Sequence, residues 1–229
     1  MENSKPENVV DFYNSFSKQY TESVKRCVPF YDEMLESLFL FLPDNFVPKN
    51  ILELGSGTGN LTKLIVKKFP SAKITAVDIS QECIEESKLQ INFPVNYVNS
   101  NFKEIYFAEN SFDLIVSSIS IHHINDIEKQ KLFGKLFQYQ TTGGILSFCD
   151  QFCAETNEIY LKYISEWKKH AFSKGSNDDE WNMWMQHQKD HDFHSTLENH
   201  TNWLKQAGYK NIDCTKRHLL WTTIFAQKL

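Results

Sequence analysis

The chain has 229 residues, of which 41% are hydrophobic, and 24 Lys and Arg against 29 Asp and Glu give a formal net charge of −5. This acidic excess disfavours a nucleic-acid partner, because such binding depends on clustered Lys and Arg, and no segment has the apolar length of a membrane span or the pattern of a signal peptide. The five cysteines are scattered and form no Cys-x-x-Cys pair, so we expect reduced thiols in a cytoplasmic protein that contacts no membrane.

Residues 1–48 are expected to form a helical cap. Apolar side chains recur at helical spacing along two stretches, so each stretch predicts an amphipathic helix with one buried face. The first stretch carries Phe12, Phe16 and Tyr20, and the second carries Phe30, Met34, Leu38 and Leu42.

Residues 50–150 alternate short β-branched runs with longer helical patterns, which indicates βαβ units around a parallel sheet. The runs that predict strands are 50–54, 73–77, 95–98, 112–117 and 144–148. Ser80 is placed to cap one helix, and Asn125 with Glu128 resembles a capping box at the start of a later one. Right-handed crossovers between parallel strands then constrain the topology.

Residues 154–195 are polar, aromatic and histidine-rich, and a loop signal at 173–178 divides them. An insertion here would lie across the open edge of the sheet, so we expect a helical lid. Its aromatic and methionine side chains suit a small-molecule pocket. The residues expected to line this pocket are Trp181, Trp184, His187 and His191. Exposed aromatic side chains also mark protein contacts, so a homodimer through this region is the alternative.

Residues 196–229 close the chain with a helix over 197–206, which ends at Gly208. Two strands follow, 211–216 and 220–227. Their connection is too short for a crossover helix, so they must form an antiparallel hairpin. The expected fold is therefore α/β in a single domain, residues 1–229, with a doubly wound, mixed seven-stranded sheet that is parallel except for this hairpin.

The sharpest motif is Glu53-Leu54-Gly55-Ser56-Gly57-Thr58-Gly59, between the first strand of the sheet and the helix that follows it. Glycines there permit positive φ and let a ligand approach the backbone. A phosphate-binding P-loop would continue with Gly-Lys-Ser/Thr, which is absent. A dinucleotide fingerprint would place its third glycine one residue later, where Asn60 stands, so a dinucleotide-dependent dehydrogenase is disfavoured.

Asp78 stands nineteen residues after Gly59, at the end of the second predicted strand. A carboxylate there accepts hydrogen bonds from both hydroxyls of a ribose and repels a ribose 2′-phosphate. The two motifs together therefore favour a nucleoside with a free 2′-hydroxyl.

The glycine loop, Asp78 and the strand order resemble a class I S-adenosylmethionine-dependent methyltransferase of the small, stand-alone type. The resemblance covers residues 50–150, which would be the cofactor-binding core, together with the closing hairpin. It implies a Rossmann-like fold, enzymatic activity, S-adenosyl-L-methionine as cofactor and S-adenosyl-L-homocysteine as product. The residues at which it implies cofactor contacts are Glu53, Gly55, Ser56, Gly57, Gly59, Asp78, Ile79, Asn101, Phe102, Ser118 and Tyr20.

The resemblance also implies a role for each of these positions. The glycines line the methionine and ribose portion, Asp78 holds the ribose, and Ile79 packs on the adenine. Glu53 orients the loop or reaches the methionine amino group through water. Asn101 stands where the family usually has an aspartate that accepts from the adenine amino group, which an amide oxygen can also do. Phe102 would lie near the adenine, and Tyr20 would close over the cofactor. For each of these two aromatic residues, an ordinary packing role is the alternative.

Residues 117–123 follow the fourth strand, where ligands of open α/β sheets collect, and they include His122 and His123. Methyl transfer from a sulfonium is an in-line displacement, so the protein must align the acceptor, exclude water and, for some acceptors, remove a proton. Histidine suits proton removal near neutral pH, and we expect His123 or His122 to line the site and act as the base. The alternative is that one caps the following helix and the other packs.

On one continuous helix, His187, His191 and His194 would form a stripe that binds a divalent metal or presents bases to a substrate. A solvated polar face is the alternative. Because no H-E-x-x-H or comparable signature is present, we expect no metal.

The sequence therefore predicts an S-adenosylmethionine-dependent methyltransferase that acts on oxygen, nitrogen or carbon of a small, partly apolar metabolite. Two alternatives keep the cofactor. One is a methyltransferase that modifies tRNA or protein, and the other is a protein that binds S-adenosylmethionine without turnover.

Overall fold

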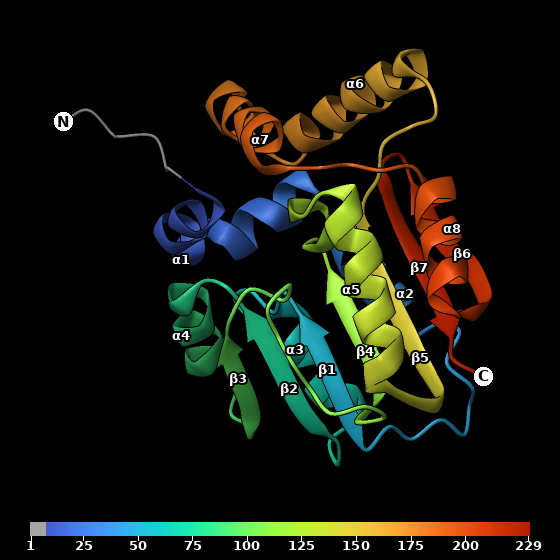
Figure 1. Ribbon diagram of the computed structural model, residues 1–229. Coiled ribbons are helices and arrows are strands. Elements are labelled where there is room, and N and C mark those ends of the chain that lie inside the picture. The colour runs from blue at the N-terminus through green and yellow to red at the C-terminus, as the bar shows by residue number, and fades with distance from the viewer. Residues whose placement is uncertain (1–7) are drawn as a thin grey trace.

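The computed structural model describes residues 8–229 and arranges them around a seven-stranded sheet (Figure 1). The strands are β1 (Asn50–Leu54), β2 (Lys73–Asp78), β3 (Val95–Asn99), β4 (Phe112–Ser118), β5 (Gln140–Gln151), β6 (Lys210–His218) and β7 (Trp221–Gln227). Their order is β3-β2-β1-β4-β5-β7-β6, parallel from β3 to β5, with β7 antiparallel to both of its neighbours. The expected mixed sheet with an antiparallel C-terminal hairpin is confirmed.

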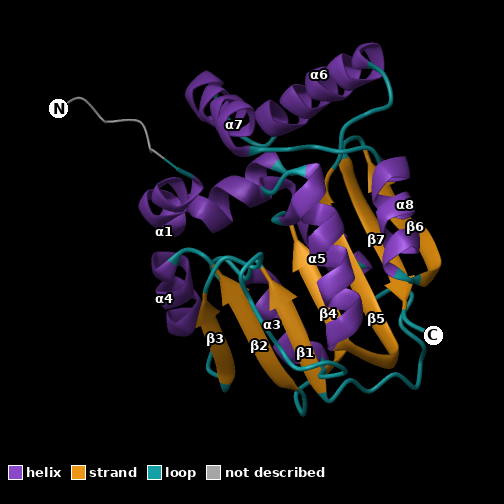
Figure 2. Ribbon diagram, in the orientation of Figure 1, coloured by secondary structure: helices purple, strands orange, loops and turns teal. Residues whose placement is uncertain are grey.

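Helices cover both faces of this sheet and its upper edge (Figure 2). They are α1 (Val9–Cys27), α2 (Tyr31–Ser37), α3 (Asn60–Lys68), α4 (Gln81–Gln90), the short 3₁₀ helix η1 (Ile121–His123), α5 (Asp126–Tyr139), α6 (Asn157–Ser173), α7 (Asp178–His191) and α8 (Leu197–Ala207). In Figure 2, α5 and α8 lie in front of the sheet, and α1, α6 and α7 gather beyond the carboxyl ends of the parallel strands. Among residues 8–229, no helix combines the length and the apolar character that crossing a membrane requires.

Successive residues of β1 serve opposite faces of the sheet, because side chains alternate along a strand. Ile51 belongs to a buried cluster with Met34 of α2 and Ile65 of α3. Leu52 belongs to a second cluster with Phe133 of α5 and Leu204 of α8. The sheet is therefore buried on both faces, which explains the nearly continuous apolar runs that predict its central strands.

Local capping signals set the ends of three helices. The Ser80 side chain accepts a hydrogen bond from the Cys83 backbone N–H at the start of α4, and Asn125 and Glu128 form the predicted capping box of α5. Gly208, with φ of 112°, ends α8 as expected. These contacts are formed within a few residues, which is why the sequence alone reveals them.

Two expectations about element boundaries are wrong. Phe30 does not share a helical face with Met34, because the chain turns between α1 and α2, and Phe30 stands before α2 with φ of 54° and 49% exposure. The predicted strand 144–148 is part of a longer β5 that starts at Gln140. Two adjacent glycines at 143 and 144 conceal its first half, since glycine is depleted in strands.

The lid formed by α6 and α7 is tied to α1. Trp167 Nε1 of α6 donates a hydrogen bond to the Cys27 carbonyl at 2.7 Å. In α7, the Glu180 carboxylate accepts hydrogen bonds from Ser23 Oγ at 2.5 Å and from Arg26 Nε and Nη2 at 3.0 and 2.7 Å. Burial would raise the pKa of Glu180, but Arg26 and Ser23 lower it to about 2.

Replacing Glu180 by Gln is expected to destabilise the fold by about 1–2 kcal/mol at neutral pH, because it removes the charge that pairs with Arg26. The folded-state pKa of about 2 lies below the ordinary value of 4.5, so the pair stabilises the fold above pH 4.5 and loses this effect as the pH falls towards 2. Urea unfolding of both proteins at pH 7 and pH 3 measures the difference, which should shrink by more than half at pH 3. Equal differences at the two pH values would contradict this role of Glu180.

Candidate active site

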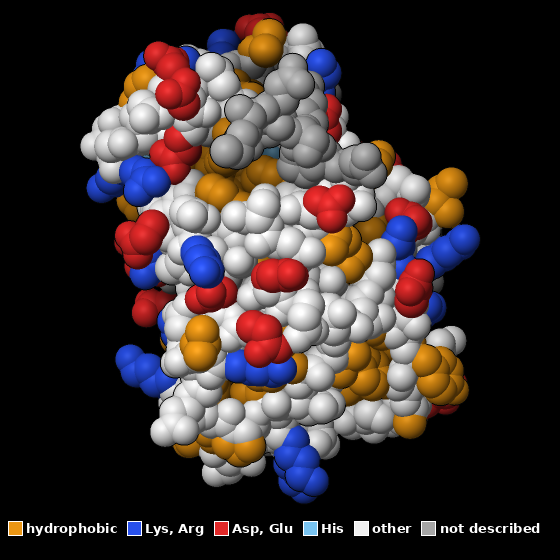
Figure 3. All heavy atoms as spheres, turned by 90° about the vertical axis from the view of Figure 1, so that its left-hand side faces the viewer, with side chains coloured by type: hydrophobic (Ala, Val, Ile, Leu, Met, Phe, Trp, Pro, Cys, Tyr) orange, Lys and Arg blue, Asp and Glu red, His pale blue; other side chains and the backbone are white. Residues whose placement is uncertain are grey.

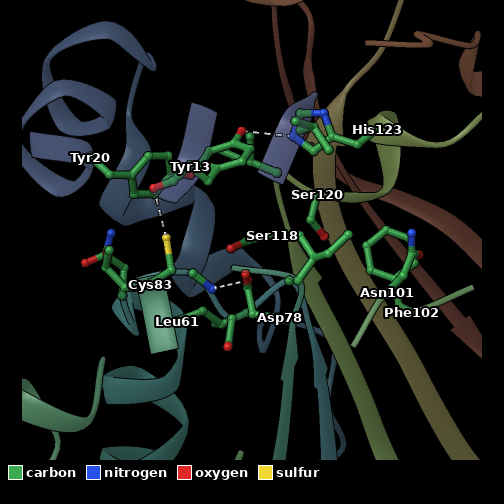
Figure 4. A pocket seen from close by; sticks show the side chains of 18 of the residues that line it. Tyr13, Tyr20, Leu61, Asp78, Cys83, Asn101, Phe102, Ser118, Ser120 and His123 are labelled. Atoms are coloured by element: carbon green, nitrogen blue, oxygen red, sulfur yellow. Dashed lines mark hydrogen bonds between the residues drawn. The ribbon is translucent and has the colours of Figure 1, made fainter. Parts of the chain in front are cut away.

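The strand order reverses between β1 and β4, so the segments that follow these strands turn away from each other and leave a crevice. A first cavity of about 960 Å³, including its open mouth, lies at this point (Figure 4). Most residues expected to contact the cofactor line it, namely Tyr20, Gly55, Ser56, Gly57, Asp78, Ile79, Asn101, Phe102 and Ser118. In Figure 4, Ser118 and Ser120 lie between Asp78 below and the Tyr13–His123 pair above.

Gly57 and Asp78 form the floor of the first cavity. Gly57 has φ of 51°, and a Cβ there would point into open space, since its nearest neighbour would be Tyr20 Cε1 at 4.0 Å. The Asp78 carboxylate accepts hydrogen bonds from the backbone N–H groups of Gly57 at 2.6 Å and Ser80 at 2.8 Å. Burial raises the pKa of Asp78, and these backbone donors partly offset that effect. Each carboxylate oxygen keeps a free lone pair for a ligand.

Gly55 and Gly59 serve packing more than ligand contact. A Cβ on Gly55 would lie 2.3 Å from Ser120 Cβ, and one on Gly59 would lie 2.4 Å from Ser87 Oγ. Gly55 still lines the first cavity, but Gly59 is not among its lining residues. The position of Gly59 thus suits packing, because this glycine lets α3 approach α4, and its expected contact with the cofactor stays a prediction.

Replacing Gly55 by Ala is expected to destabilise the fold by about 3 kcal/mol, since the new methyl group would overlap Ser120 and the residue has φ of 66°. Gly57 has a similar backbone conformation, but a methyl group there would overlap no neighbour. Gly57→Ala is therefore expected to destabilise the fold by only about 1 kcal/mol. Thermal unfolding of the two variants without ligand gives the comparison. A Gly55→Ala variant as stable as Gly57→Ala would contradict the close contact with Ser120.

Glu53 lies beneath the glycine loop and does not line the first cavity. Its Oε2 accepts a hydrogen bond from Thr62 Oγ1 of α3 at 2.7 Å, whereas its Oε1 is buried without a hydrogen-bond partner. Burial raises the pKa of Glu53 to about 8. This position suits the role of orienting the glycine loop. To interact with the methionine amino group, Glu53 would need a bridging water.

Asn101 lines the first cavity, but its side chain already has a partner. Its Oδ1 accepts a hydrogen bond from the Lys103 backbone N–H at 3.0 Å. One lone pair of this oxygen remains for the adenine amino group, as the resemblance implies.

His122 and His123 lie on η1, directly beyond β4, and each imidazole has partners on both sides. His122 Nδ1 donates to Asp150 Oδ1 of β5, and its Nε2 lies 3.6 Å from Asp192 Oδ1. His123 Nδ1 lies 3.1 Å from the same Asp192 oxygen, and its Nε2 forms a hydrogen bond with the Tyr13 hydroxyl at 2.9 Å. The helix that follows, α5, is capped by Asn125 and not by either histidine.

The surroundings shift the pKa values of the two histidines in opposite directions. Burial lowers the pKa of His122, but Asp150 and Asp192 outweigh this effect and raise it overall. Burial and the nearby His122 lower the pKa of His123. Burial would raise the pKa of Asp192, but His122 and His123 hold it well below its ordinary value.

Three proteins illustrate what the chain is similar to. An uncharacterized methyltransferase of Bacillus cytotoxicus is 29% identical over 168 residues, which cover 72% of this chain and 74% of that protein. Malonyl-[acyl-carrier protein] O-methyltransferase 1 of Ilyobacter polytropus is 34% identical over 119 residues, 50% of this chain and 42% of that protein. Human N-acetylserotonin methyltransferase in complex with S-adenosylmethionine shares the fold, with TM-score 0.60 and 16% identity over 96% of this chain and 55% of that one. The chain thus spans about half the length of the Ilyobacter polytropus protein and of the human protein.

A family profile described as a methyltransferase domain matches residues 51–144. The match contains the glycine loop, Asp78 and both histidines that follow β4. The chain is a class I S-adenosylmethionine-dependent methyltransferase. The matched residues do not include α1 or the lid, so the methyltransferase builds the upper walls of its cavities from segments outside the family match.

A second cavity of the methyltransferase, about 450 Å³ including its open mouth, adjoins the first beneath the lid. Tyr13, Tyr20 and Ile119 line both cavities. The other residues that line the second one are Val24, Cys27, Val28, His122, Gln151, Trp167, Trp184, His187, Gln188, Asp192 and Trp221. Its walls therefore combine Tyr and Trp side chains with an equal number of polar side chains.

Two of the four residues expected to line a substrate pocket do line this second cavity, Trp184 and His187. Trp181 instead packs in the core, edge-on to Trp167 with ring centroids 4.8 Å apart. His191 is the last residue of α7 and lines neither cavity. The predicted histidine stripe is also wrong, because α7 ends before His194.

Two polar residues of this methyltransferase site were not predicted from the sequence, Tyr13 and Asp150. Both carry a recognisable signal. Asp150 comes soon after the apolar run 144–148, at the carboxyl end of a strand, and Tyr13 lies seven residues before Tyr20 and therefore on the same helical face. Asp192 belongs to the histidine-rich stretch 154–195, but its contacts with His122 and His123 depend on the fold.

Proposed function

We propose that the methyltransferase moves a methyl group from S-adenosylmethionine in the first cavity to a small, partly apolar acceptor in the second. The observation that carries this proposal is the common wall of the two cavities, formed by Tyr13, Tyr20 and Ile119. A molecule in the second cavity would face one in the first, which favours the in-line approach that methyl transfer requires.

The residues of the first cavity fit the cofactor. The open space over Gly57 admits a ligand close to the backbone, and the buried Asp78 carboxylate has free lone pairs for the two ribose hydroxyls. Ile79 and Phe102 offer apolar surface to the adenine, and Asn101 offers an acceptor to its amino group. When bound, S-adenosylmethionine supplies a methyl group that is already activated by its sulfonium.

The residues around the second cavity would orient the acceptor and exclude water. Trp167, Trp184 and Trp221 provide apolar walls, and the lid that carries the first two is held to α1. The Tyr13 hydroxyl, fixed by His123, is the polar group at the boundary of the two cavities. Burial and Asp192 raise the pKa of Tyr13 well above its ordinary value, so its hydroxyl stays protonated and can donate to the acceptor.

The enclosure of the second cavity favours a small acceptor over tRNA or protein. On the face that carries α1 and α4, Figure 3 shows Lys and Arg interspersed with Asp and Glu, and no continuous basic area forms among the described residues there. Nucleic-acid binding draws its affinity from such an area, so this face offers little support for it.

Calorimetric titration of the purified protein with S-adenosylmethionine, S-adenosylhomocysteine and NADH tests the cofactor. We expect saturable binding of the first two and none of NADH. Native mass spectrometry of the purified protein would then reveal a co-purified acceptor, and formation of S-adenosylhomocysteine with that acceptor measures turnover.

Each part of the proposal has its own contrary result. Retention of NADH without binding of either sulfur nucleoside would overturn the cofactor assignment. Turnover only with tRNA or protein would overturn the small acceptor. Binding without turnover over a broad acceptor panel would favour a protein that holds the cofactor without transferring methyl.

A further inference from the structure

A group of metal-ligating side chains, one buried and two partly buried, lies outside the residues expected to contact the cofactor. His122, His123 and Asp192 each offer one nitrogen or oxygen, and these three atoms all lie within 4.8 Å of one another. The Asp192 side chain is only 5% exposed, and its Oδ1 has no hydrogen-bond partner of good geometry. A buried carboxylate oxygen without such a partner is costly, so its position needs an explanation.

The distances around this oxygen suit a metal shell. His123 Nδ1 lies 3.1 Å from Asp192 Oδ1, His122 Nε2 lies 3.6 Å away, and His187 Nε2 lies 3.7 Å away. Ligand atoms bonded to one ion at about 2.0–2.2 Å are separated by roughly 3.0–3.5 Å in tetrahedral or octahedral geometry. The separation of His123 Nδ1 from Asp192 Oδ1 falls in this range, and that of His122 Nε2 from the same oxygen slightly exceeds it. The two nitrogens lie within 4.8 Å of each other, so they would move closer together on binding an ion.

The outer contacts of these histidines are those of metal ligands. A ligating histidine usually gives its second ring nitrogen to a carboxylate or another fixed polar group, which orients the ring. His122 Nδ1 is held by Asp150, so its Nε2 faces Asp192. His123 Nε2 is held by the Tyr13 hydroxyl, so its Nδ1 faces the same oxygen.

We propose that His122 Nε2, His123 Nδ1 and Asp192 Oδ1 bind a divalent transition-metal ion. Two imidazoles and one carboxylate favour an ion such as Zn²⁺ or Co²⁺ over Mg²⁺ or Ca²⁺, which prefer oxygen ligands. His122, His187 and Asp192 line the second cavity, so remaining coordination positions open towards the acceptor. The proposal goes beyond methyl transfer and does not depend on it.

The sequence predicts no metal because the ligands come from separate segments. His122 and His123 follow β4, whereas Asp192 lies just beyond α7. No contiguous ligand motif marks such a site. The expected alternative, a stripe of His187, His191 and His194 on one helix, shares no residue with it.

Titration of the tag-free protein with Zn²⁺, after removal of bound metal by a chelator, tests the site. We expect one ion per chain and, in Asp192→Asn, an affinity at least about tenfold lower. Asp150→Asn leaves all ligands in place but frees the His122 ring, so a loss of about 10-fold to 100-fold is expected. His218→Gln, on β6 and outside the cluster, is the matched control and should bind as the unaltered chain does.

Co²⁺ adds a readout of ligand type. We expect visible absorption typical of nitrogen and oxygen ligands and no thiolate charge-transfer band. No Zn²⁺ binding by the unaltered chain, equal affinity in Asp192→Asn, or a thiolate band would each overturn the proposal. Because S-adenosylhomocysteine takes no part in these titrations, their failure would leave the proposed methyl transfer untouched.

Discussion

Replacing Asp78 by Ala is expected to weaken S-adenosylhomocysteine binding by at least about 100-fold. In the proposed complex the buried carboxylate accepts from both ribose hydroxyls, and hydrogen bonds to a charged group contribute about 1.5–3 kcal/mol each. The change also removes an acceptor from the backbone N–H groups of Gly57 and Ser80, which loosens the loop that receives the ligand. Calorimetry gives the affinity.

Asp213→Ala is the matched control, since Asp213 is an exposed aspartate of β6 in the same sheet. It should bind the nucleoside as the unaltered chain does. Circular dichroism verifies that both variants fold. An Asp78→Ala variant that is folded and binds with the original affinity would rule out the ribose contact and the placement of the nucleoside in the first cavity.

Replacing Glu53 by Gln is expected to stabilise the ligand-free protein at alkaline pH. The folded-state pKa of about 8 exceeds the ordinary value of 4.5, so Glu53 stays protonated in the fold where it would ionise in the unfolded chain. Its contribution to stability is therefore complete below pH 4.5 and is lost as the pH rises through 8. Gln carries no charge, so by pH 9 the variant should exceed the unaltered chain by up to about 4 kcal/mol.

Urea unfolding from pH 5 to pH 9 measures this difference, which should be below about 1 kcal/mol at pH 5. Glu109→Gln changes an exposed glutamate and serves as the control, with no expected effect. Coincident stability curves for Glu53→Gln and the unaltered chain would show that the carboxyl is not desolvated. A ligand amino group that reaches Glu53 through water would reduce the difference, because it stabilises the ionised form.

The sheet could be predicted from the sequence because its signals are local. Asn125 with Glu128 and the turn before Trp221 each act over a few residues, and the β-branched runs need no distant partner. The Gly57 and Asp78 positions were recognisable for the same reason, since Asp78 ends β2 and Gly57 belongs to the loop that follows β1.

The histidine cluster could not be predicted, because it depends on contacts between distant segments. The Asp192 side chain meets His123 only after α7 has folded back over the sheet, and its neighbour in sequence, His191, points to no cavity. Trp181 was misassigned for a similar reason. An aromatic residue in a lid suits either a pocket or the core, and the decision depends on the position of Trp167, fourteen residues earlier.

Helix α1 has a consequence for how the two ligands affect each other. Its Tyr13 and Tyr20 belong to the walls of both cavities, and Ser23 and Arg26 near its end hold the lid through Glu180. A displacement of this one helix that admits an acceptor therefore also alters the fit of the nucleoside. Occupancy of the two cavities is then thermodynamically linked, and by reciprocity each ligand changes the affinity of the other by the same factor.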